Sequence, residues 1–230
     1  MAENTEKLVL GVNGGPRKGW NTDLLLKEIL KGAEAEGAET ELIDLYKLNF
    51  RGCVSCFSCK RVESHRNGKC ALKDDLSPVL TRLEKATGLA MGSPIYLSDV
   101  TGALRSFLER YIFMNIVYSA EDPPVLERGP AMALVYTMNV TYDTAVGMRY
   151  DVMFKAHQKI LSALKPPFIE TLYSCDTLQF DDYSSYYAPR FDSENKKRRR
   201  RDDFPLELKK AYEIGRLLGK YEKSPLIYKP

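Results

Sequence analysis

The 230-residue sequence has no long apolar run, little net charge and only two histidines. No apolar segment approaches the roughly 18–20 residues that span a bilayer, so we expect no membrane-spanning helix. The first residues are polar and lead directly into a strand-like run, from which we expect no signal peptide and a cytoplasmic protein. A net charge of +3 does not indicate nucleic-acid binding. We interpret the one basic run, KKRRRR at residues 196–201, as a solvated helix start or loop.

The sequence does have an unusual concentration of cysteines. Four of its five cysteines lie within residues 51–75, RGCVSCFSCKRVESHRNGKCALKDD. They are Cys53, Cys56, Cys59 and Cys70. In a reducing cytoplasm, clustered thiols indicate a metal or redox role rather than structural disulfides.

Three interpretations of these cysteines stay open. The C-x₂-C-x₂-C run favours a four-iron cluster, which is held by cysteine thiolates. Zinc also accepts four cysteines, and His65 would then be an alternative ligand, although zinc sites more often use two separated pairs. The thiols would otherwise be free or form disulfides. The fifth cysteine, Cys175, we interpret as a small buried hydrophobic residue.

Strand-like and helix-like segments alternate along the chain. The predicted strands are residues 7–13, 40–46, 88–94, 131–139 and 168–174. Between and after them, apolar residues recur with helical spacing, including long helices at 145–164 and 206–221. This alternation predicts an α/β fold: a flavodoxin-like, doubly wound, five-stranded parallel sheet with helices on both faces. We expect a domain at 1–175 carrying the cysteine loop 51–75. A C-terminal extension at 176–230 would pack its terminal helix on that domain.

The loop after the first strand, VNGGPRKGWNTDLL, has the features of a phosphate site. Glycines allow the backbone to approach an anion, and the following helix offers unpaired N–H groups and the positive end of its dipole. Arg17 and Lys18 add charge, and Asn21 and Thr22 add donors. The loop matches neither GxxxxGK[ST] nor GxGxxG, which argues against ATP and against a Rossmann-type NAD site. The alternative is a simple tight turn between strand and helix.

Three motifs together resemble one group of proteins. The loop is similar to the GSPRxxGNT phosphate loop of the NADPH-dependent FMN reductase and iron–sulfur flavoprotein group. GSPIYLSDVTGALRSFLERY, residues 92–111, resembles the group's second flavin loop and the helix behind it. The cysteine run followed by DD resembles the cluster motif of the iron–sulfur flavoproteins, and TLQFDDYSSYYAPRFD near the C-terminus also resembles members of the group.

The resemblance implies two cofactors, FMN and a [4Fe-4S] cluster. It implies that Arg17, Asn21 and Thr22 hold the FMN phosphate, with Gly15 where the group usually has serine. Pro94, Ile95, Tyr96 and Leu97 would run along the flavin ring. Asn139, chosen by its place after the fourth strand, would meet the polar edge of the ring. The cluster ligands would be Cys53, Cys56, Cys59 and Cys70, the last farther along the chain than is usual in the group.

The function implied is electron transfer without covalent catalysis by the protein, and we expect no catalytic side chain. His157 we interpret as a packing or surface residue. Electrons would pass from ferredoxin or NAD(P)H, through cluster and FMN, to a small acceptor such as oxygen, peroxide or a quinone. A homodimer or homotetramer would bring the FMN of one subunit to the cluster of another. The alternatives are an NAD(P)H-dependent FMN or quinone reductase without a cluster, and an electron carrier or redox-sensing binding protein.

Overall fold

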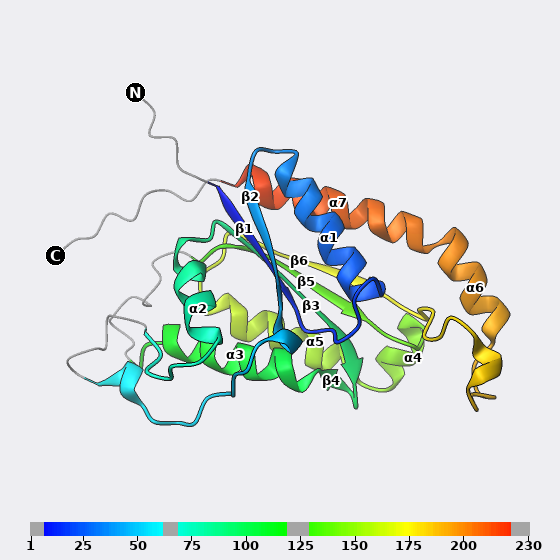
Figure 1. Cartoon of the computed structure of the whole chain (residues 1–230), viewed down its shortest axis with the longest axis horizontal. Helices are drawn as coiled ribbons and strands as arrows, with labels where there is room; N and C mark the ends of the chain where they lie inside the picture. The colour runs from blue at the N-terminus through cyan, green and yellow to red at the C-terminus, as the bar shows by residue number, and fades with distance from the viewer. Residues whose placement is uncertain (1–6, 62–68, 119–128, 222–230) are drawn as a thin grey trace.

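A twisted parallel sheet forms the centre of the molecule (Figure 1). The computed structural model describes residues 7–61, 69–118 and 129–221. Five parallel strands occur in the order β2-β1-β3-β5-β6. Their bounds are β1 Leu8–Asn13, β2 Glu39–Asp44, β3 Gly88–Tyr96, β5 Ala131–Thr137 and β6 Ile169–Ser174. This is the flavodoxin-like strand order, and the predicted fold is confirmed. A sixth strand that we did not predict, β4 (Asp99–Val100), pairs antiparallel with the end of β3.

The central strands are buried on both faces. Every residue of β5 is buried, as are five of the six residues of β1. Helices cover both faces of a parallel sheet, so its inner strands appear in the sequence as nearly continuous apolar runs rather than as an alternating pattern. This is why AMALVYT and LVLGVN could be recognised as strands.

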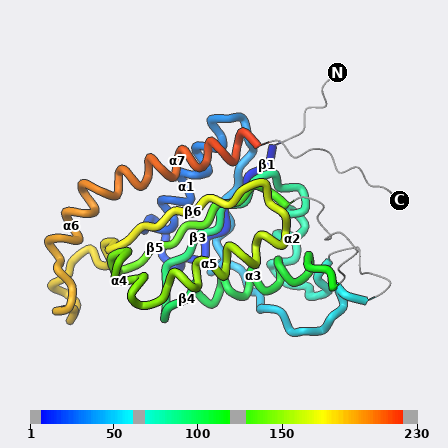
Figure 2. The backbone as a smooth tube through the Cα atoms, turned by 180° about the vertical axis from the view of Figure 1, so that it is seen from behind, coloured from blue at the N-terminus to red at the C-terminus, as the bar shows by residue number. Residues whose placement is uncertain are grey.

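Helices lie on both sides of the sheet (Figures 1 and 2). One face carries α1 (Asn21–Glu34) and α7 (Phe204–Lys220), and the other carries α2 (Leu76–Lys85), α3 (Gly102–Asn115) and α5 (Tyr150–Ser162). Backbones of α1 and α7 touch: a Cβ atom added at Gly215 would lie 1.9 Å from the carbonyl oxygen of Ile29. The terminal helix therefore packs directly on the first helix and shares its core, where Leu218 is fully buried.

Two helical predictions need correction. The helix predicted over 145–164 is two helices, α4 (Tyr142–Gly147) and α5, because Arg149 between them adopts a left-handed conformation with φ of 67°. The basic run lies inside α6 (Ser193–Asp202), and one of its members, Lys196, is only 1% exposed. The solvated interpretation is therefore wrong for that residue. His65 and most of a proline-containing stretch at 122–130 lie outside the described residues.

None of the helices in the described ranges combines the length and the apolar character needed to cross a membrane.

Candidate functional site

The register of the sheet brings four loops to one edge. Asn13 at the end of β1 pairs with Gly92 of β3, and further along β3 Pro94 pairs with Thr137 at the end of β5. Thr137 pairs in turn with Ser174 at the end of β6. Because the carboxyl ends of parallel strands face the same way, the loops that follow these strands meet beyond that edge, where open α/β sheets bind their ligands.

The loop after β1 is held tightly against its neighbours. The N–H of Gly14 donates to the carbonyl oxygen of Gly92 at 2.8 Å, and its own carbonyl oxygen accepts from the Thr101 hydroxyl at 2.6 Å. A Cβ atom at Gly14 would lie 2.7 Å from the Cβ of Leu104. A glycine is therefore required where the loop leaves the strand, because the start of α3 occupies the space of a side chain.

A cleft with about 630 Å³ of empty space, open to solvent, lies between these loops. Eight of the nine residues that we predicted for FMN line it. They are Gly15, Arg17, Asn21, Thr22, Pro94, Ile95, Tyr96 and Asn139. The ninth, Leu97, lies at the tip of the β3–β4 hairpin and is completely exposed. Leu97 and Ser98 both have positive φ, 49° and 69°, as the two central residues of a type I′ hairpin turn do.

Among the described residues that line the cleft, Arg17 is the only cation. The guanidinium of Arg17 stacks over Trp20, 3.8 Å from the ring centroid, and Nη1 donates to the carbonyl oxygen of Gln179 at 2.8 Å. The neighbouring Lys18 instead forms an ion pair with Asp44 at 2.9 Å and does not line the cleft. The amino end of α1, with its unpaired N–H groups and partial positive charge, adds to Arg17. The part of the cleft next to Arg17 and the start of α1 suits an anion.

The cleft also contains an unsatisfied acceptor. Nδ2 of Asn139 donates to Oε1 of Gln179, while Oδ1 of Asn139 is buried and has no hydrogen-bond partner within the described residues. A buried polar atom without a hydrogen-bond partner destabilises the fold, unless a ligand supplies the missing hydrogen bond. A ring N–H such as the one on the polar edge of FMN would donate to this oxygen, so the residues present fit that cofactor.

Sequence reasoning missed the third wall of the cleft. Residues 177–179, which follow β6, fold back over the cleft and line it. The side-chain amide of Asn21 donates to the carbonyl oxygen of Leu178 at 3.0 Å, and the guanidinium of Arg17 donates to that of Gln179. The available signal was the TLQF motif, which we recognised without giving its residues a role.

His157 packs away from this cleft, in agreement with our interpretation. It is buried on α5, where Nδ1 lies 3.1 Å from the hydroxyl of Tyr136 and Nε2 lies 3.5 Å from Oδ1 of Asp99. Burial lowers the pKa of His157, and the Asp99 carboxylate only partly opposes this. Burial likewise raises the pKa of Tyr136. Both groups are therefore neutral near pH 7.

The four clustered cysteines surround a second, smaller cavity of about 330 Å³. Cys53, Cys56, Cys59 and Cys70 all line it, together with mainly apolar side chains. Burial raises the pKa of Cys59, and the neighbouring Cys70 and Cys53 act in the same direction. All five cysteines are free of disulfides. In the described part of the chain, no three Cys, His, Asp or Glu side chains are close enough to hold one metal ion.

A buried arginine adjoins the cysteine cavity. Arg110 of α3 is 1% exposed; its Nη1 donates to Asp74 at 2.6 Å and to the carbonyl oxygen of Arg51 at 3.3 Å. Its Nε has no acceptor among the described residues. Cluster sulfurs are acceptors, and hydrogen bonds to them tune the cluster. Each iron of such a cluster takes one thiolate, so four thiols around one mainly apolar cavity with a spare buried donor fit it, even though no three of them lie close enough to share a single ion.

Comparison with known proteins identifies the family. The sequence model of the NADPH-dependent FMN reductases matches residues 8–149, more than half of the chain. The chain belongs to the NADPH-dependent FMN reductase family. An iron–sulfur flavoprotein of Methanocaldococcus jannaschii is 36% identical over 153 residues, covering 66% of this chain and 74% of the relative. One from Archaeoglobus fulgidus is 32% identical over 102 residues, covering 44% of this chain and 47% of the relative. The chain thus spans about three quarters of the first relative and about half of the second.

Solved structures share the fold of this FMN reductase family member. The NAD(P)H:quinone oxidoreductase from Methanothermobacter marburgensis superposes with a TM-score of 0.64 at 17% identity, covering 95% of this chain and all of that one. An FMN-dependent NADH-azoreductase from Bacillus anthracis in complex with FMN gives 0.63 at 13% identity, covering 93% of this chain and all of that one. At these identities the likeness shows the fold alone. Family membership makes the protein a flavin-dependent oxidoreductase.

Proposed function

We propose that this oxidoreductase passes electrons between FMN in the large cleft and a [4Fe-4S] cluster on Cys53, Cys56, Cys59 and Cys70. The observation that carries the proposal is the presence of two separate cavities in one chain. One is a flavin-type cleft at the switch point of the sheet, and the other is lined by four free thiols. The relatives named iron–sulfur flavoproteins support the pairing.

Different residues of the cleft would bind different parts of FMN. Arg17, Asn21 and Thr22, with the amino end of α1, would bind its phosphate. Asn139 would orient the ring by accepting a hydrogen bond at Oδ1, and residues 177–179 would keep water from that edge. When bound, FMN supplies one- and two-electron chemistry, while a cluster supplies single electrons. Arg110, which also lines the cysteine cavity, would stabilise the cluster's negative charge.

The electron donor that we favour is a reduced nicotinamide, because the family is named for NADPH-dependent reduction of FMN. Ferredoxin is the alternative single-electron donor. The acceptor would be a small molecule such as oxygen, peroxide or a quinone, and the clustered free thiols suit a reducing cytoplasm. The family name also supports a second candidate, an NAD(P)H-dependent FMN or quinone reductase without a cluster.

Anaerobic purification followed by flavin, iron, sulfide and zinc analysis tests the proposal. We expect FMN and about four irons and four sulfides per chain. Cys56→Ser should lose the iron and keep the FMN, whereas Cys175→Ser, outside the cysteine cavity, should keep both. Iron retained in full by Cys56→Ser would contradict the ligand set. Wild-type protein with FMN but without iron and sulfide would favour the cluster-free reductase.

A further inference from the structure

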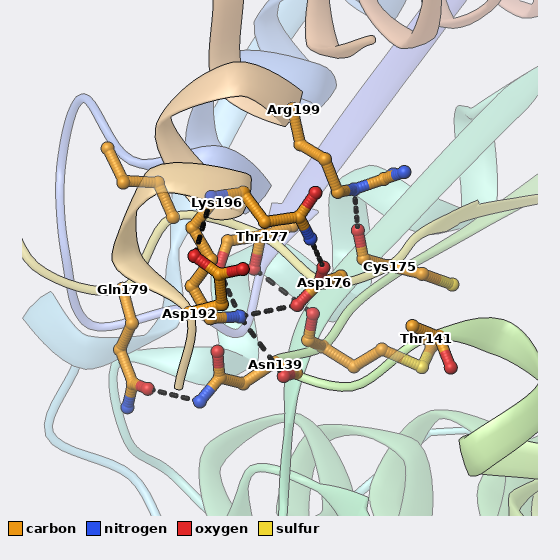
Figure 3. Close-up of polar contacts among 12 residues, drawn as sticks. Asn139, Thr141, Cys175, Asp176, Thr177, Gln179, Asp192, Lys196 and Arg199 are labelled. Carbon is orange, nitrogen blue, oxygen red and sulfur yellow. Dashed lines mark hydrogen bonds and ion pairs between the residues drawn. The ribbon is translucent and has the colours of Figure 1, made fainter. Parts of the chain in front are cut away.

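Helix α6 turns half of its basic run toward the cleft loops. Lys196, Arg199 and Arg200 are spaced i, i+3 and i+4, so they share one helical face. That face meets the loop after β6 (Figure 3). The other three cations pair outward with acidic side chains of the same region. These pairs are Lys197–Glu194, Arg198–Asp203 and Arg201–Asp202.

Lys196 has hydrogen-bond acceptors for all three donors of its buried ammonium. Nζ lies 2.6 Å from Oδ1 of Asp176, 3.2 Å from the carbonyl oxygen of Asn139 and 3.4 Å from that of Thr177 (Figure 3). The second carboxylate oxygen of Asp176 accepts from Asn195 at 2.9 Å. A buried charge is tolerated when it is paired and hydrogen-bonded in this way.

The two carbonyl groups belong to the loops that line the cleft. Asn139 follows β5 and presents the unsatisfied Oδ1, and Thr177 follows β6 and begins the third wall. The loops already touch through the N–H of Thr177, which donates to the carbonyl oxygen of Met138 at 3.0 Å. The N–H of Asp176 also donates to the carbonyl oxygen of Val140 at 2.8 Å. To these direct bonds Lys196 adds one to each loop from outside the cleft, so a single ammonium group ties both loops to α6.

The remaining inward cations connect α6 to the segment after β6 and to the start of α1. Nε of Arg199 donates to the carbonyl oxygen of Cys175 at 3.2 Å. Nη1 of Arg200 donates to Oδ1 of Asn21 at 2.9 Å, and Asn21 bonds Leu178. Helix α6 therefore holds the segment 175–178 from one side, while the loop after β1 holds it from the other.

We propose that Lys196 is a positioning residue of the flavin site, which fixes Asn139 and the third wall through their carbonyl groups. The inference rests on the proposed function in one respect, that the cleft takes FMN. Lys196 is not among the residues that line the cleft, so we expect it to make no contact with bound FMN. Its removal therefore acts on FMN only through the two loops.

The test is FMN affinity of the full chain, freed of flavin, measured by quenching of flavin fluorescence. Circular dichroism sets a temperature at which every variant is folded. Lys196→Met keeps the length of the side chain and removes its donors, and we expect binding about tenfold weaker. At saturating FMN, the visible circular dichroism of the bound flavin should also change, because Asn139 shifts at the ring edge.

Two matched controls separate positioning from general destabilisation. Lys197→Met removes the neighbouring, outward cation and should leave FMN affinity within about twofold. Leu83→Ala opens the core on α2, on the other face of the sheet, and should lower the melting temperature without weakening FMN binding. Equal loss of affinity in Leu83→Ala and Lys196→Met would overturn the proposal.

A double variant tests whether the charge balance or the carbonyl contacts matter. Lys196→Met with Asp176→Asn leaves no unpaired buried charge, so the melting temperature should recover toward that of the wild type. FMN affinity should stay low, and recovery to the wild-type value would overturn the proposal. If Lys196→Met alone does not fold, the FMN affinity of this double variant tests the proposal in its place. Wild-type protein that binds no FMN would overturn the proposed function as well, whereas unchanged affinity in a folded Lys196→Met variant overturns this inference alone.

Discussion

Arg17 and Lys18 are adjacent cations with different surroundings, and their alanine variants should differ in FMN affinity. Arg17 lines the cleft, stacked on Trp20, whereas Lys18 is paired with Asp44. A hydrogen bond to a charged group contributes about 1.5–3 kcal/mol, which we reduce to about 1–2 kcal/mol because Arg17 is exposed to solvent. Arg17→Ala should therefore weaken FMN binding about 5–30-fold. Lys18→Ala should change it by less than about twofold.

Fluorescence titration of flavin-free protein with FMN and with riboflavin measures this difference. Riboflavin lacks the phosphate, so Arg17→Ala should leave its affinity unchanged. Added salt should weaken FMN binding to the wild type more than to Arg17→Ala, because salt screens exposed charges. Equal losses in Arg17→Ala and Lys18→Ala would refute a directed contact and indicate only the overall charge of the loop. Loss of riboflavin affinity in Arg17→Ala would place the side chain at the ring instead of the phosphate.

Two further predictions concern stability. Gly215→Ala forces a Cβ atom against the carbonyl oxygen of Ile29, and urea denaturation should show a loss of at least about 1–3 kcal/mol; Gly147→Ala, with open space around it, should show none. Burial lowers the pKa of His157. The imidazole of His157 therefore becomes protonated near pH 6.5 in the unfolded chain, but stays neutral at that pH in the folded chain. The free energy of unfolding should thus decrease as pH falls below about 6.5, and His157→Gln should reduce that decrease; an unchanged pH profile would contradict the role of this residue.

The strands and the first two loops that line the cleft could be predicted because their signals are local. A strand buried on both faces is a continuous apolar run, and a glycine-rich loop between strand and helix has a fixed place at the edge of the sheet. The break at Arg149 could not be predicted, because arginine carries no preference for the left-handed conformation that it adopts there. Leu97 followed the motif in sequence, but the hairpin turn points it into solvent.

The third wall of the cleft depends on contacts between distant segments. Gln179 is 162 residues from Arg17, and Leu178 is 157 residues from Asn21. No periodicity or turn signal near residue 178 indicates such a return. The cysteine cavity is an intermediate case: the spacing in sequence predicted that Cys53, Cys56 and Cys59 would be neighbours. Cys70 was predicted to join them only from the resemblance, and the fold brings it to the same cavity from farther along the chain.

The basic run shows why charge alone misleads about burial. Six consecutive cations indicate solvent exposure, because an isolated buried charge is costly. That cost is removed for Lys196 by Asp176, twenty residues earlier, and by two carbonyl oxygens that the strand ends leave free. Helical spacing alone would have placed residues 196, 199 and 200 on one face of the helix. An acidic residue shortly after a buried strand, here Asp176, can form the ion pair that lets a cation on that face be buried. A cationic helix that follows the last strand of this fold is therefore better interpreted by its faces than by its total charge.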